Sequence, residues 1–260
     1  MPEGDILRRT AARLDQAVGG RVLVRAELRW PTAGGIDLVG RTVLGTTAYG
    51  KHLLTRFDDD RTLHTHLRMD GSWRIARSGS PSASAGPFAR AVLGADTWTA
   101  IGDRLGMLDV VATRDERTLI GHLGPDLLAS DFPTTGLPEA IRRWAARGAA
   151  PVCDVLLDQG VVAGIGTIYL AESLFARRTW PWTPADEVEA PDQILLVARA
   201  LMARSVLAPE GSGGIAAVSR AVHGRLRAPC RRCGTPIAVG KARMPPMERP
   251  VFYCPTCQHP

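Results

Sequence analysis

The first five residues, Met1-Pro2-Glu3-Gly4-Asp5, place a proline next to a carboxylate at the start of the chain. Many chains lose an initiator methionine that precedes a small residue, and we expect Met1 to be removed. Pro2 would then carry a free amine, and the pKa of an α-amino group, about 7.7–8.0, is well below the value of about 10.4 for lysine. Such an amine attacks carbonyl-like carbons to form Schiff bases, and the Glu3 carboxyl can transfer the protons. The alternative is an ordinary start codon followed by a helix N-terminus.

Four of the five cysteines form two C-x2-C pairs near the C-terminus, Cys230 with Cys233 and Cys254 with Cys257. The 20 residues between the pairs give the spacing of a zinc ribbon or finger, in which two tight turns each offer two thiolates. Two disulfides are the alternative, but disulfides are rare in a reducing cytosol. We expect one structural zinc ion with no open position for catalysis. Cys153 lies in the apolar segment V-C-D-V-L-L and is expected in the core.

Basic residues are concentrated at the same end of the chain. The whole chain has 32 Lys or Arg against 26 Asp or Glu, a net charge of +6. From residue 211 onward there are eight Lys or Arg and one acid, Glu248, so this segment carries +7 and the preceding residues sum to −1. Such a concentration predicts a polyanionic partner, most often nucleic acid, rather than a surface that only confers solubility.

Three further groups could take part in such a site. Gly164-Ile165-Gly166-Thr167 opens a predicted helix, where backbone N–H groups and the helix dipole favour an anion such as phosphate; a tight helix–helix turn is the alternative. Lys51 follows Gly50 in Y-G-K-H-L-L, which would hold its stem on a rigid hairpin. His64 and His66 alternate on the partner strand and share a face. Without a third ligand they favour a structural role or a phosphate contact over a metal.

The first half of the chain must position these residues on a β-structure. Apolar residues recur at helical spacing from Asp5 to Val18, and a period of two follows. Ser78–Pro87 is a predicted mobile loop because it is rich in Ser, Gly, Pro and Ala. One helix and about eight strands predict a β-sandwich or barrel. The predicted strands are Arg21–Trp30, Arg41–Tyr49, Lys51–Phe57, Thr62–Arg68, Ser72–Ala76, Arg90–Leu93, Thr97–Ile101 and Leu108–Ala112.

The second half is predicted to be helical. The pattern changes near Gly124-Pro125-Asp126, and Asp131–Pro138, with two prolines and a glycine, is a predicted linker. Glu210–Gly214 is a predicted glycine-rich loop. We therefore divide the chain into a β-domain at 1–130, a helical domain at 131–220 and a zinc-finger hairpin at 221–260. The predicted helices are Pro138–Arg147, Val152–Asp158, Thr167–Arg177 and Pro191–Val206.

No targeting or membrane segment is apparent in the sequence. No apolar run approaches the roughly 20 residues of a membrane span. The N-terminus lacks the layout of a signal peptide because Arg8, Arg9 and Asp15 interrupt it. We expect a cytoplasmic monomer that associates with the nucleoid when it binds DNA.

Together these motifs resemble the formamidopyrimidine-DNA glycosylase / endonuclease VIII family of base-excision repair enzymes. M-P-E-G-D is similar to the start of the actinobacterial-type endonuclease VIII branch, G-K-H-L-L to the family's hairpin lysine, and H-L-R-M-D-G-S-W to the following strand and turn. H-L-G-P-D-L-L at 122–128, V-V-A-G-I-G-T-I-Y-L-A-E, and V-H-G-R at 222–225 with R-P-V-F-Y-C-P-T-C-Q-H resemble later segments. The resemblance implies an α+β two-domain fold: an N-terminal helix plus β-sandwich, then a helical domain with a helix–two-turn–helix motif and a zinc-finger hairpin.

The resemblance implies a bifunctional DNA glycosylase and AP lyase that acts on damaged double-stranded DNA. Pro2 would attack C1′ of the damaged nucleotide and displace the base, and Glu3 would act as the adjacent acid or base. Lys51 would contact the phosphate beside the lesion and assist elimination, and Arg249 would clamp that phosphate. The endonuclease VIII-like start favours oxidised pyrimidines as substrates.

Further residues would contact the DNA while the nucleotide is turned out of the duplex. Met69 aligns with the family's wedge residue, and Leu105, in D-R-L-G, with a second filler. Gly166, Thr167 and Arg225 would bind the backbone. Thr167 departs from the asparagine usual in G-x-G-N, and its hydroxyl donates one hydrogen bond where an amide donates two.

Two alternatives accompany this interpretation. The first is a glycosylase of the same family specialised for bulky alkylated or cross-linked bases, which the Thr167 departure suggests. The second is a non-catalytic protein that binds damaged DNA. The presence of Pro2, Glu3 and Lys51 together favours an enzyme, because a protein that only binds DNA has no need of an N-terminal proline amine.

Overall fold

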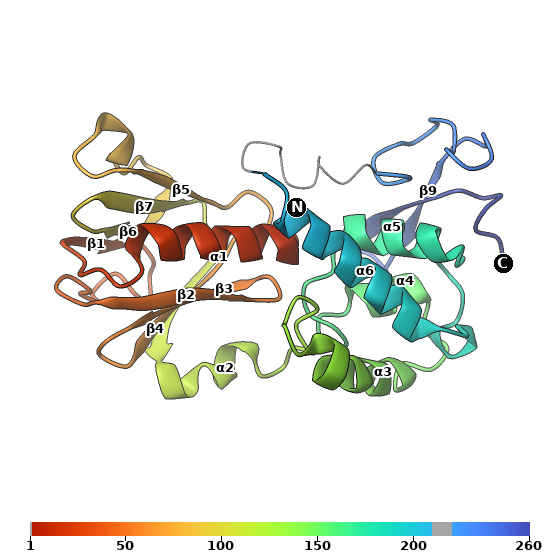
Figure 1. Ribbon diagram of the computed structural model, residues 1–260, viewed down its shortest axis with the longest axis horizontal. Coiled ribbons are helices and arrows are strands. Elements are labelled where there is room, and N and C mark those ends of the chain that lie inside the picture. Colours follow the sequence, from red (N-terminus) through yellow and green to blue (C-terminus); the bar gives the residue numbers. More distant parts are fainter. Residues whose placement is uncertain (1, 210–219) are drawn as a thin grey trace. The chain divides into compact units, whose positions relative to one another are not determined.

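The computed structural model describes residues 2–209 and 220–260, which form two compact units (Figure 1). One unit contains Pro2 and Ile6–His122, and the other contains Glu3–Asp5 and Leu123–Pro260. The start of the chain is therefore divided between the units: Pro2 belongs to the first, Glu3–Asp5 belong to the second, and the chain returns to the first at Ile6. The predicted loop at Glu210–Gly214 lies outside the described residues, and the three-part division at 130 and 220 stays a prediction.

The first unit is a helix packed with two antiparallel sheets. Helix α1, Gly4–Val18, buries Leu7, Leu14 and Val18 along one side, as its helical periodicity predicts. The sheets have the strand orders β1-β6-β7-β5 and β2-β3-β4-β8, which confirms the predicted sandwich. The strands are β1 Arg25–Leu28, β2 Val43–Tyr49, β3 His52–Phe57, β4 Arg61–His66, β5 Ser72–Arg77, β6 Ala89–Gly94, β7 Trp98–Asp103 and β8 Met107–Ala112.

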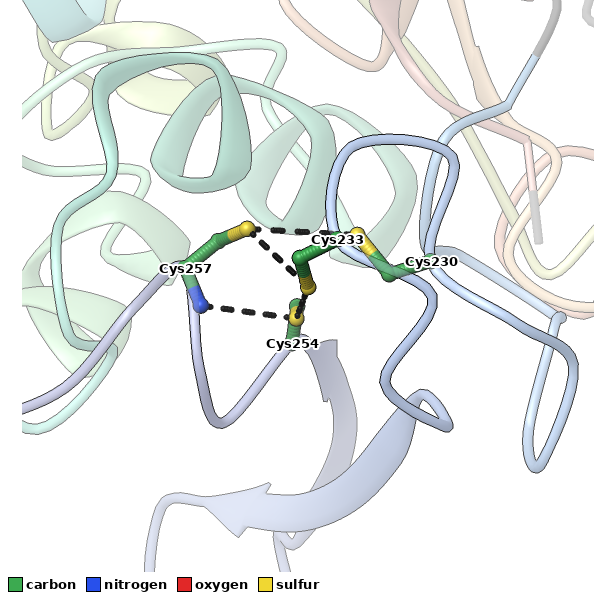
Figure 2. Close-up of side chains that lie close together, drawn as sticks. All are labelled: Cys230, Cys233, Cys254 and Cys257. Atoms are coloured by element: carbon green, nitrogen blue, oxygen red, sulfur yellow. Dashed lines mark hydrogen bonds between the residues drawn. The ribbon is translucent and has the colours of Figure 1, made fainter.

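The second unit is built around one helix that is buried along most of its length. Helix α5, Thr167–Arg177, is buried from Thr167 to Phe175 and packs against α4, α6 and β10. Helices α4 and α5 with the turns between them form the helix–two-turn–helix segment, and the antiparallel pair β9–β10 joins the two cysteine pairs (Figure 2). The other elements are α3 Leu137–Ala145, α4 Val152–Leu157, α6 Pro191–Val206, β9 Ala238–Ala242 and β10 Arg249–Tyr253.

The linker prediction at Asp131–Pro138 was wrong. Phe132–Gly136 is a π-helical turn that continues directly into α3, and the Phe132 ring is fully buried. The backbone carbonyl of Asp131 accepts the N–H groups of Thr134 and Thr135 at 3.1 and 2.8 Å. Prolines in this segment stand in the first turns of the helices, where a missing N–H costs little.

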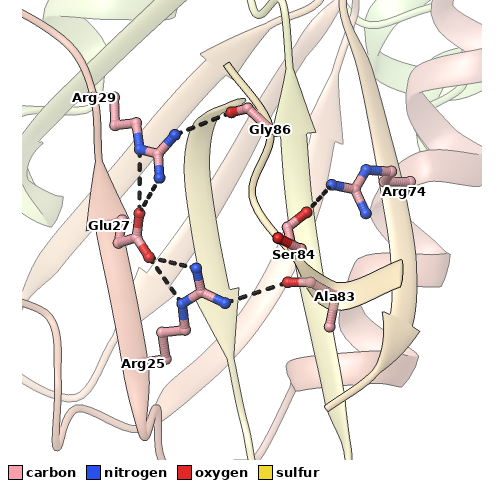
Figure 3. Close-up of polar contacts among 7 residues, drawn as sticks. All are labelled: Arg25, Glu27, Arg29, Arg74, Ala83, Ser84 and Gly86. Carbon is pink, nitrogen blue, oxygen red and sulfur yellow. Dashed lines mark hydrogen bonds and ion pairs between the residues drawn. The ribbon is translucent and has the colours of Figure 1, made fainter. Parts of the chain in front are cut away.

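The segment predicted as a mobile loop at Ser78–Pro87 is fastened to the sheet (Figure 3). It contains a 3-10 turn at Pro81–Ala83, and arginines of the neighbouring strands donate to its carbonyl groups. Arg25 donates to Ala83 at 3.2 Å, Arg29 to Gly86 at 3.0 Å and Arg74 to Ser84 at 2.6 Å. Periodicity could not show this, because hydrogen bonds from side chains leave no repeat in the sequence, and Arg25 and Arg29 lie 58 and 57 residues before their partners.

One short helix was not predicted from the sequence, and the first predicted strand is shorter than expected. Helix α2, Arg117–Ile120, is a single turn, too short to give a periodic signal. The predicted strand Arg21–Trp30 shortens to β1, and Val22 forms only an isolated bridge with Thr42. None of the helices within the described residues is long and apolar enough to cross a membrane.

Candidate active site

The Glu3 carboxylate is bound at the N-terminus of α5. Its side chain is 0% exposed, and it accepts the backbone N–H groups of Gly166 at 2.8 Å, Ile168 at 2.8 Å and Tyr169 at 3.4 Å. Three donors and the positive end of the helix dipole stabilise the negative charge of this carboxylate. Glu3 is therefore held in one position, directly after Pro2 in the chain.

Two glycines of the sequence motifs make this contact possible. A Cβ atom at Gly166 would lie 2.4 Å from Cδ of Glu3, so an alanine there would overlap the carboxyl group. A Cβ atom at Gly4 would lie 2.8 Å from Cε of Met202, and the Gly4 N–H donates to the carbonyl of Gly164 at 3.0 Å. The glycines of M-P-E-G-D and G-I-G-T are thus explained by close packing.

Asp5 ties the same segment to two helices of the second unit. Its fully buried carboxylate accepts the Tyr169 hydroxyl at 2.7 Å and the Ser205 hydroxyl at 2.6 Å. Burial and the neighbouring Asp5 carboxylate raise the pKa of Tyr169, so the phenol keeps its proton and remains a donor. Residues 3–5 are consequently fixed by both α5 and α6.

The G-I-G-T turn differs from the sequence-based expectation of a phosphate site. The N–H of Gly166 is donated to Glu3, and Thr167 is 8% exposed. The anion at this helix N-terminus is a side chain of the chain itself. Phosphate binding by Gly166 and Thr167 stays a prediction, and in this conformation their backbone offers little open surface for it.

Lys51 lies in the hairpin turn between β2 and β3, one residue before the strand that it was predicted to begin, and it follows Gly50 with φ of 55°. It is half-buried, and His52 follows it at the start of β3. His64 and His66 lie on the neighbouring strand β4 and share one face with His52. The hairpin therefore brings a lysine and three imidazoles together. The sequence predicted that His64 and His66 share a face, but it did not indicate that His52 joins them.

The two predicted DNA fillers differ in exposure. Met69 is 61% exposed in the turn between β4 and β5, so its side chain is accessible, and its role as a wedge stays a prediction. Leu105 is 3% exposed and packs in the core of the first unit, with its Cδ1 beside Gly102. The neighbouring Arg104 is the exposed side chain of that turn, and its guanidinium lies 4.0 Å from the Phe88 ring centroid. Leu105 in its observed position supports the core.

The four paired cysteines converge on one point (Figure 2). Their sulfur atoms all lie within 4.8 Å of one another, with Cys233 3.5 Å from Cys254 and Cys230 4.0 Å from Cys257. These separations are far longer than a disulfide bond of about 2.05 Å. They match the edges of about 3.8 Å of a tetrahedron with metal–sulfur bonds of about 2.3 Å. The four thiols are arranged to hold one metal ion.

The thiol pKa of the isolated Cys153 is shifted in the opposite direction from that of Cys233 in the four-cysteine cluster. Cys153 is fully buried, and burial raises the pKa of its thiol, which confirms the prediction that it belongs to the core. Among the four clustered cysteines, hydrogen bonding by Thr235 lowers the pKa of Cys233 to about 6, whereas burial raises the pKa of Cys254 and raises that of Cys257 to about 12.

The cysteine module is attached to the other end of α5. Arg232 lies with its guanidinium 4.0 Å from the Phe175 ring centroid and donates to the Phe175 carbonyl at 2.6 Å. The fully buried Gln258 donates to the Thr179 carbonyl at 2.9 Å and accepts the Cys254 N–H at 3.0 Å. One helix thus holds Glu3 at its N-terminus and the cysteine module near its C-terminus.

Glu172, in the middle of α5, was not singled out from the sequence. Its carboxylate is 6% exposed and accepts the N–H groups of Ala221 at 2.7 Å, Val222 at 3.0 Å and His223 at 2.8 Å. An acid in an otherwise apolar helix, in Y-L-A-E-S-L-F, is the signal that could have identified it. Glu172 positions the segment that enters the cysteine module.

The two arginines predicted to contact DNA are hydrogen-bonded to backbone carbonyls. Arg249 begins β10 and donates to the carbonyl of Glu248 at 2.9 Å. Arg225 donates to the carbonyls of Ala221 at 2.6 Å and Pro229 at 2.9 Å, which braces that loop. Both side chains are half-buried, and their roles toward DNA stay predictions.

Comparison with known proteins gives matches along nearly the whole chain. Residues 1–124 match the formamidopyrimidine-DNA glycosylase N-terminal domain, and residues 123–214 match the formamidopyrimidine-DNA glycosylase H2TH domain. Probable endonuclease 8 2 of Streptomyces coelicolor is 41% identical over 263 residues, which covers 99% of this chain and 94% of that protein. DNA-(apurinic or apyrimidinic site) lyase Nei2 of Mycolicibacterium smegmatis is 34% identical over 261 residues and 99% of each chain.

Solved structures match the fold equally well. The MutM (Fpg) protein of Thermus thermophilus has a TM-score of 0.79 at 29% identity, covering 99% of this chain and 98% of that one. The Lactococcus lactis formamidopyrimidine DNA glycosylase, non-covalently bound to DNA containing an AP site, has a TM-score of 0.83 at 21% identity, covering 99% and 100%. The second likeness shows a shared fold.

Proposed function

The chain belongs to the formamidopyrimidine-DNA glycosylase family, and on that premise we propose which of its residues carry out the reaction. It is a DNA glycosylase and AP lyase of base-excision repair, acting on damaged or abasic DNA. The observation that supports the residue assignment is the immobilised Glu3 carboxylate, which directly follows the proline whose amine the reaction needs.

Pro2 is the nucleophile of the proposed mechanism. After removal of Met1, its amine attacks C1′ of the damaged nucleotide, the base leaves, and an iminium ion forms between Pro2 and the opened sugar. The iminium ion makes the C2′ protons acidic, so that a base can remove one and the 3′ phosphate leaves. One amine therefore accounts for both base removal and strand cleavage.

Glu3 is the proposed proton acceptor and donor beside this amine. The three N–H groups of α5 hold its carboxylate in one position, and in the charged form a carboxylate first accepts a proton. The sugar ring must open for the iminium ion to form, and the proton that Glu3 accepts from the attacking amine can be returned to the ring oxygen. Asp5 and α6 keep the segment from moving as DNA is bound.

Lys51 and Arg249 are the proposed phosphate-binding cations. Lys51 is supported by the hairpin turn, and Arg249 is oriented by the carbonyl of Glu248. The hydrogen bond restricts the rotation of the Arg249 side chain, so less side-chain entropy is lost when Arg249 binds a phosphate. Met69, exposed on its turn, is the proposed wedge that fills the space of the turned-out nucleotide.

Zinc is the proposed ion of the four-cysteine site, because four thiolates in a tetrahedral arrangement are its preferred structural ligands. When bound it supplies folding energy to the hairpin that carries Arg249, and it takes no part in the chemistry. The endonuclease VIII-like start of the chain, M-P-E-G-D, favours oxidised pyrimidines as the excised bases.

Borohydride trapping tests the central assignment. The mature protein is incubated with duplex DNA containing an abasic site and reduced, and the covalent adduct is mapped by mass spectrometry. We expect the adduct on residue 2, and a chain extended by two residues before Pro2 should bind the DNA and give no adduct. An adduct mapped to Lys51, or one of equal yield in the extended chain, would contradict the assignment. Binding with no adduct in either chain would favour a damaged-DNA-binding protein.

A further inference from the structure

A row of imidazoles in the first unit has no role in the mechanism above. The register of the sheet places His52 of β3 opposite His66 of β4, and His64 of β4 opposite Asp109 of β8. Residues two apart on a strand share a face, so all three imidazoles lie on one side of the sheet. Lys51 directly precedes His52 at the hairpin turn.

These groups form a hydrogen-bonded chain. Nδ1 of His52 lies 2.7 Å from Nε2 of His64, and Nδ1 of His64 lies 3.2 Å from Oδ2 of Asp109. The His52 and His64 rings are stacked with centroids 5.0 Å apart, and the His66 ring meets His52 edge-on at 4.9 Å. His64 is 1% exposed, whereas His52 and His66 are half-buried.

The hydrogen bonds assign the protons of the neutral chain. Asp109 accepts, so His64 carries its proton on Nδ1 and its Nε2 is an acceptor. His52 must then donate from Nδ1, which leaves a lone pair on its Nε2. His66 accepts the Arg68 N–H at Nδ1 and therefore carries its proton on Nε2. The chain thus ends in one site, His52 Nε2, that can accept a proton.

The surroundings keep the chain neutral in the free protein. Burial lowers the pKa of His52 to about 3 and that of His66 to about 4. The groups that face His52 are His64, His66, His122 and Lys51, all of which are or can become cationic. Burial also lowers the pKa of His64, against the opposing effect of Asp109, which is the one acid among these neighbours and lies at the far end of the chain.

We infer that the His52–His64–Asp109 chain, with His66, binds a DNA phosphate and takes up one proton from solvent as it does so. The proton adds to Nε2 of His52, no other bond is made or broken, and the imidazolium is stabilised by the phosphate on one side and by Asp109 through His64 on the other. This inference rests on the proposed function for the identity of the ligand.

Phosphate suits this cluster better than a metal ion. His52 and His64 use the nitrogens that face each other for a shared proton at 2.7 Å. In the part of the chain that the structure describes, only the four cysteines bring three or more ligand atoms close enough to hold a metal. Lys51 and Arg68 beside the imidazoles add positive charge, which attracts a phosphate and repels a cation.

Isothermal titration calorimetry measures how many protons the protein takes up when it binds DNA. The full chain is titrated at pH 6 with a duplex carrying a tetrahydrofuran abasic analogue, which cannot react, in buffers of different ionisation enthalpy and with EDTA-treated DNA. We expect uptake of up to about one proton per duplex, and a dissociation constant that rises with pH by up to about tenfold per unit above pH 6. His52→Asn keeps a polar group beside His64 and cannot take up the proton, so its uptake should fall toward zero.

Two further variants complete the test. His259→Asn removes an exposed histidine of the second unit and should leave the uptake unchanged. Asp109→Asn removes the charge at the far end of the chain and should shift the uptake to lower pH. Binding without proton uptake, or equal uptake in His52→Asn, overturns this inference and leaves the proposed function standing. If the protein binds cobalt and His52→Asn does not, the ligand of the histidine cluster is a metal ion and not a phosphate. The absence of DNA binding at every pH would count against the proposed function itself.

Discussion

Replacing Gly166 by alanine tests whether the contact between Glu3 and α5 organises the active site. Gly166 has φ of −127° and ψ of −162°, an extended conformation that alanine adopts without strain. The cost must therefore come from the new methyl group, which would lie 2.4 Å from Cδ and 2.6 Å from Oε1 of Glu3. Either the carboxylate leaves its site or the α5 turn moves away.

The expected loss of stability follows from the hydrogen bonds at risk. The carboxylate is fully buried and accepts three N–H groups, and a hydrogen bond to a charged group contributes about 1.5–3 kcal/mol. Losing two of them should lower the free energy of unfolding by about 3 kcal/mol or more. For a chain of this size that corresponds to a fall in melting temperature of about 6–12 °C. Borohydride trapping should fall with it, because Pro2 is joined to the displaced residue.

A double-mutant cycle separates this effect from a general intolerance of the site. Glu3→Ala removes the group that the methyl would strike, so Gly166→Ala should cost less than about 0.5 kcal/mol in that background. Gly35→Ala is the matched control, since nothing lies within 4 Å of the added methyl. Melting curves and trapping yields are compared for the set. The reasoning would be refuted if the Gly166→Ala protein melted within about a degree of the parent. It would also be refuted if Gly166→Ala lowered the stability equally in the parent and in the Glu3→Ala protein.

The other predictions concern the wedge, the core and the cysteine module. Met69→Ala should leave the melting temperature unchanged because the side chain is exposed, yet should reduce base excision from duplex DNA more than from single strands; equal loss on both would argue against a wedge. Leu105→Ala should lower stability by about 2–5 kcal/mol, as expected for a buried leucine, and a purely catalytic defect would contradict its core role. Glu172→Gln replaces an acceptor of three N–H groups by a side chain with one acceptor, so proteolysis near residue 222 should accelerate and DNA affinity should fall; unchanged cleavage would remove its positioning role. Cys233→Ser should release the bound metal, measured by a colorimetric chelator, and weaken DNA binding; full metal retention would contradict the four-thiolate site.

Local pattern in the sequence accounts for most of the secondary structure. α5 and α6 have the predicted bounds, and α1 begins one residue earlier than predicted. The eight predicted strands form the two sheets with small changes at their ends, except that the first shortens from Arg21–Trp30 to Arg25–Leu28. Helical and strand periodicity depend on which face of a segment is buried, and neighbouring residues determine that face. The metal-binding role of the cysteine pairs could also be predicted from the sequence, because each turn supplies two ligands within four residues.

Partners distant in the chain were decided only by the tertiary structure. G-I-G-T predicted an anion at the N-terminus of α5, and the anion is Glu3, 163 residues earlier in the sequence than Gly166. Leu105 is buried in the core and Arg225 braces a loop, contacts that the sequence did not show, and their roles toward DNA stay predictions.

For the histidines of one sheet, part of the arrangement could be predicted from the sequence and part depends on the tertiary structure. Alternation along β4 placed His64 and His66 on one face, as the sequence predicts. That His52 and Asp109 complete the chain depends on the register of β3 and β8 against β4. The sequence by itself determined which residue types and which local elements are available, because these follow from contacts between near neighbours. The tertiary structure decided which of them meet, because a buried charge or polar group takes whatever partner the packing of distant segments brings within hydrogen-bonding distance.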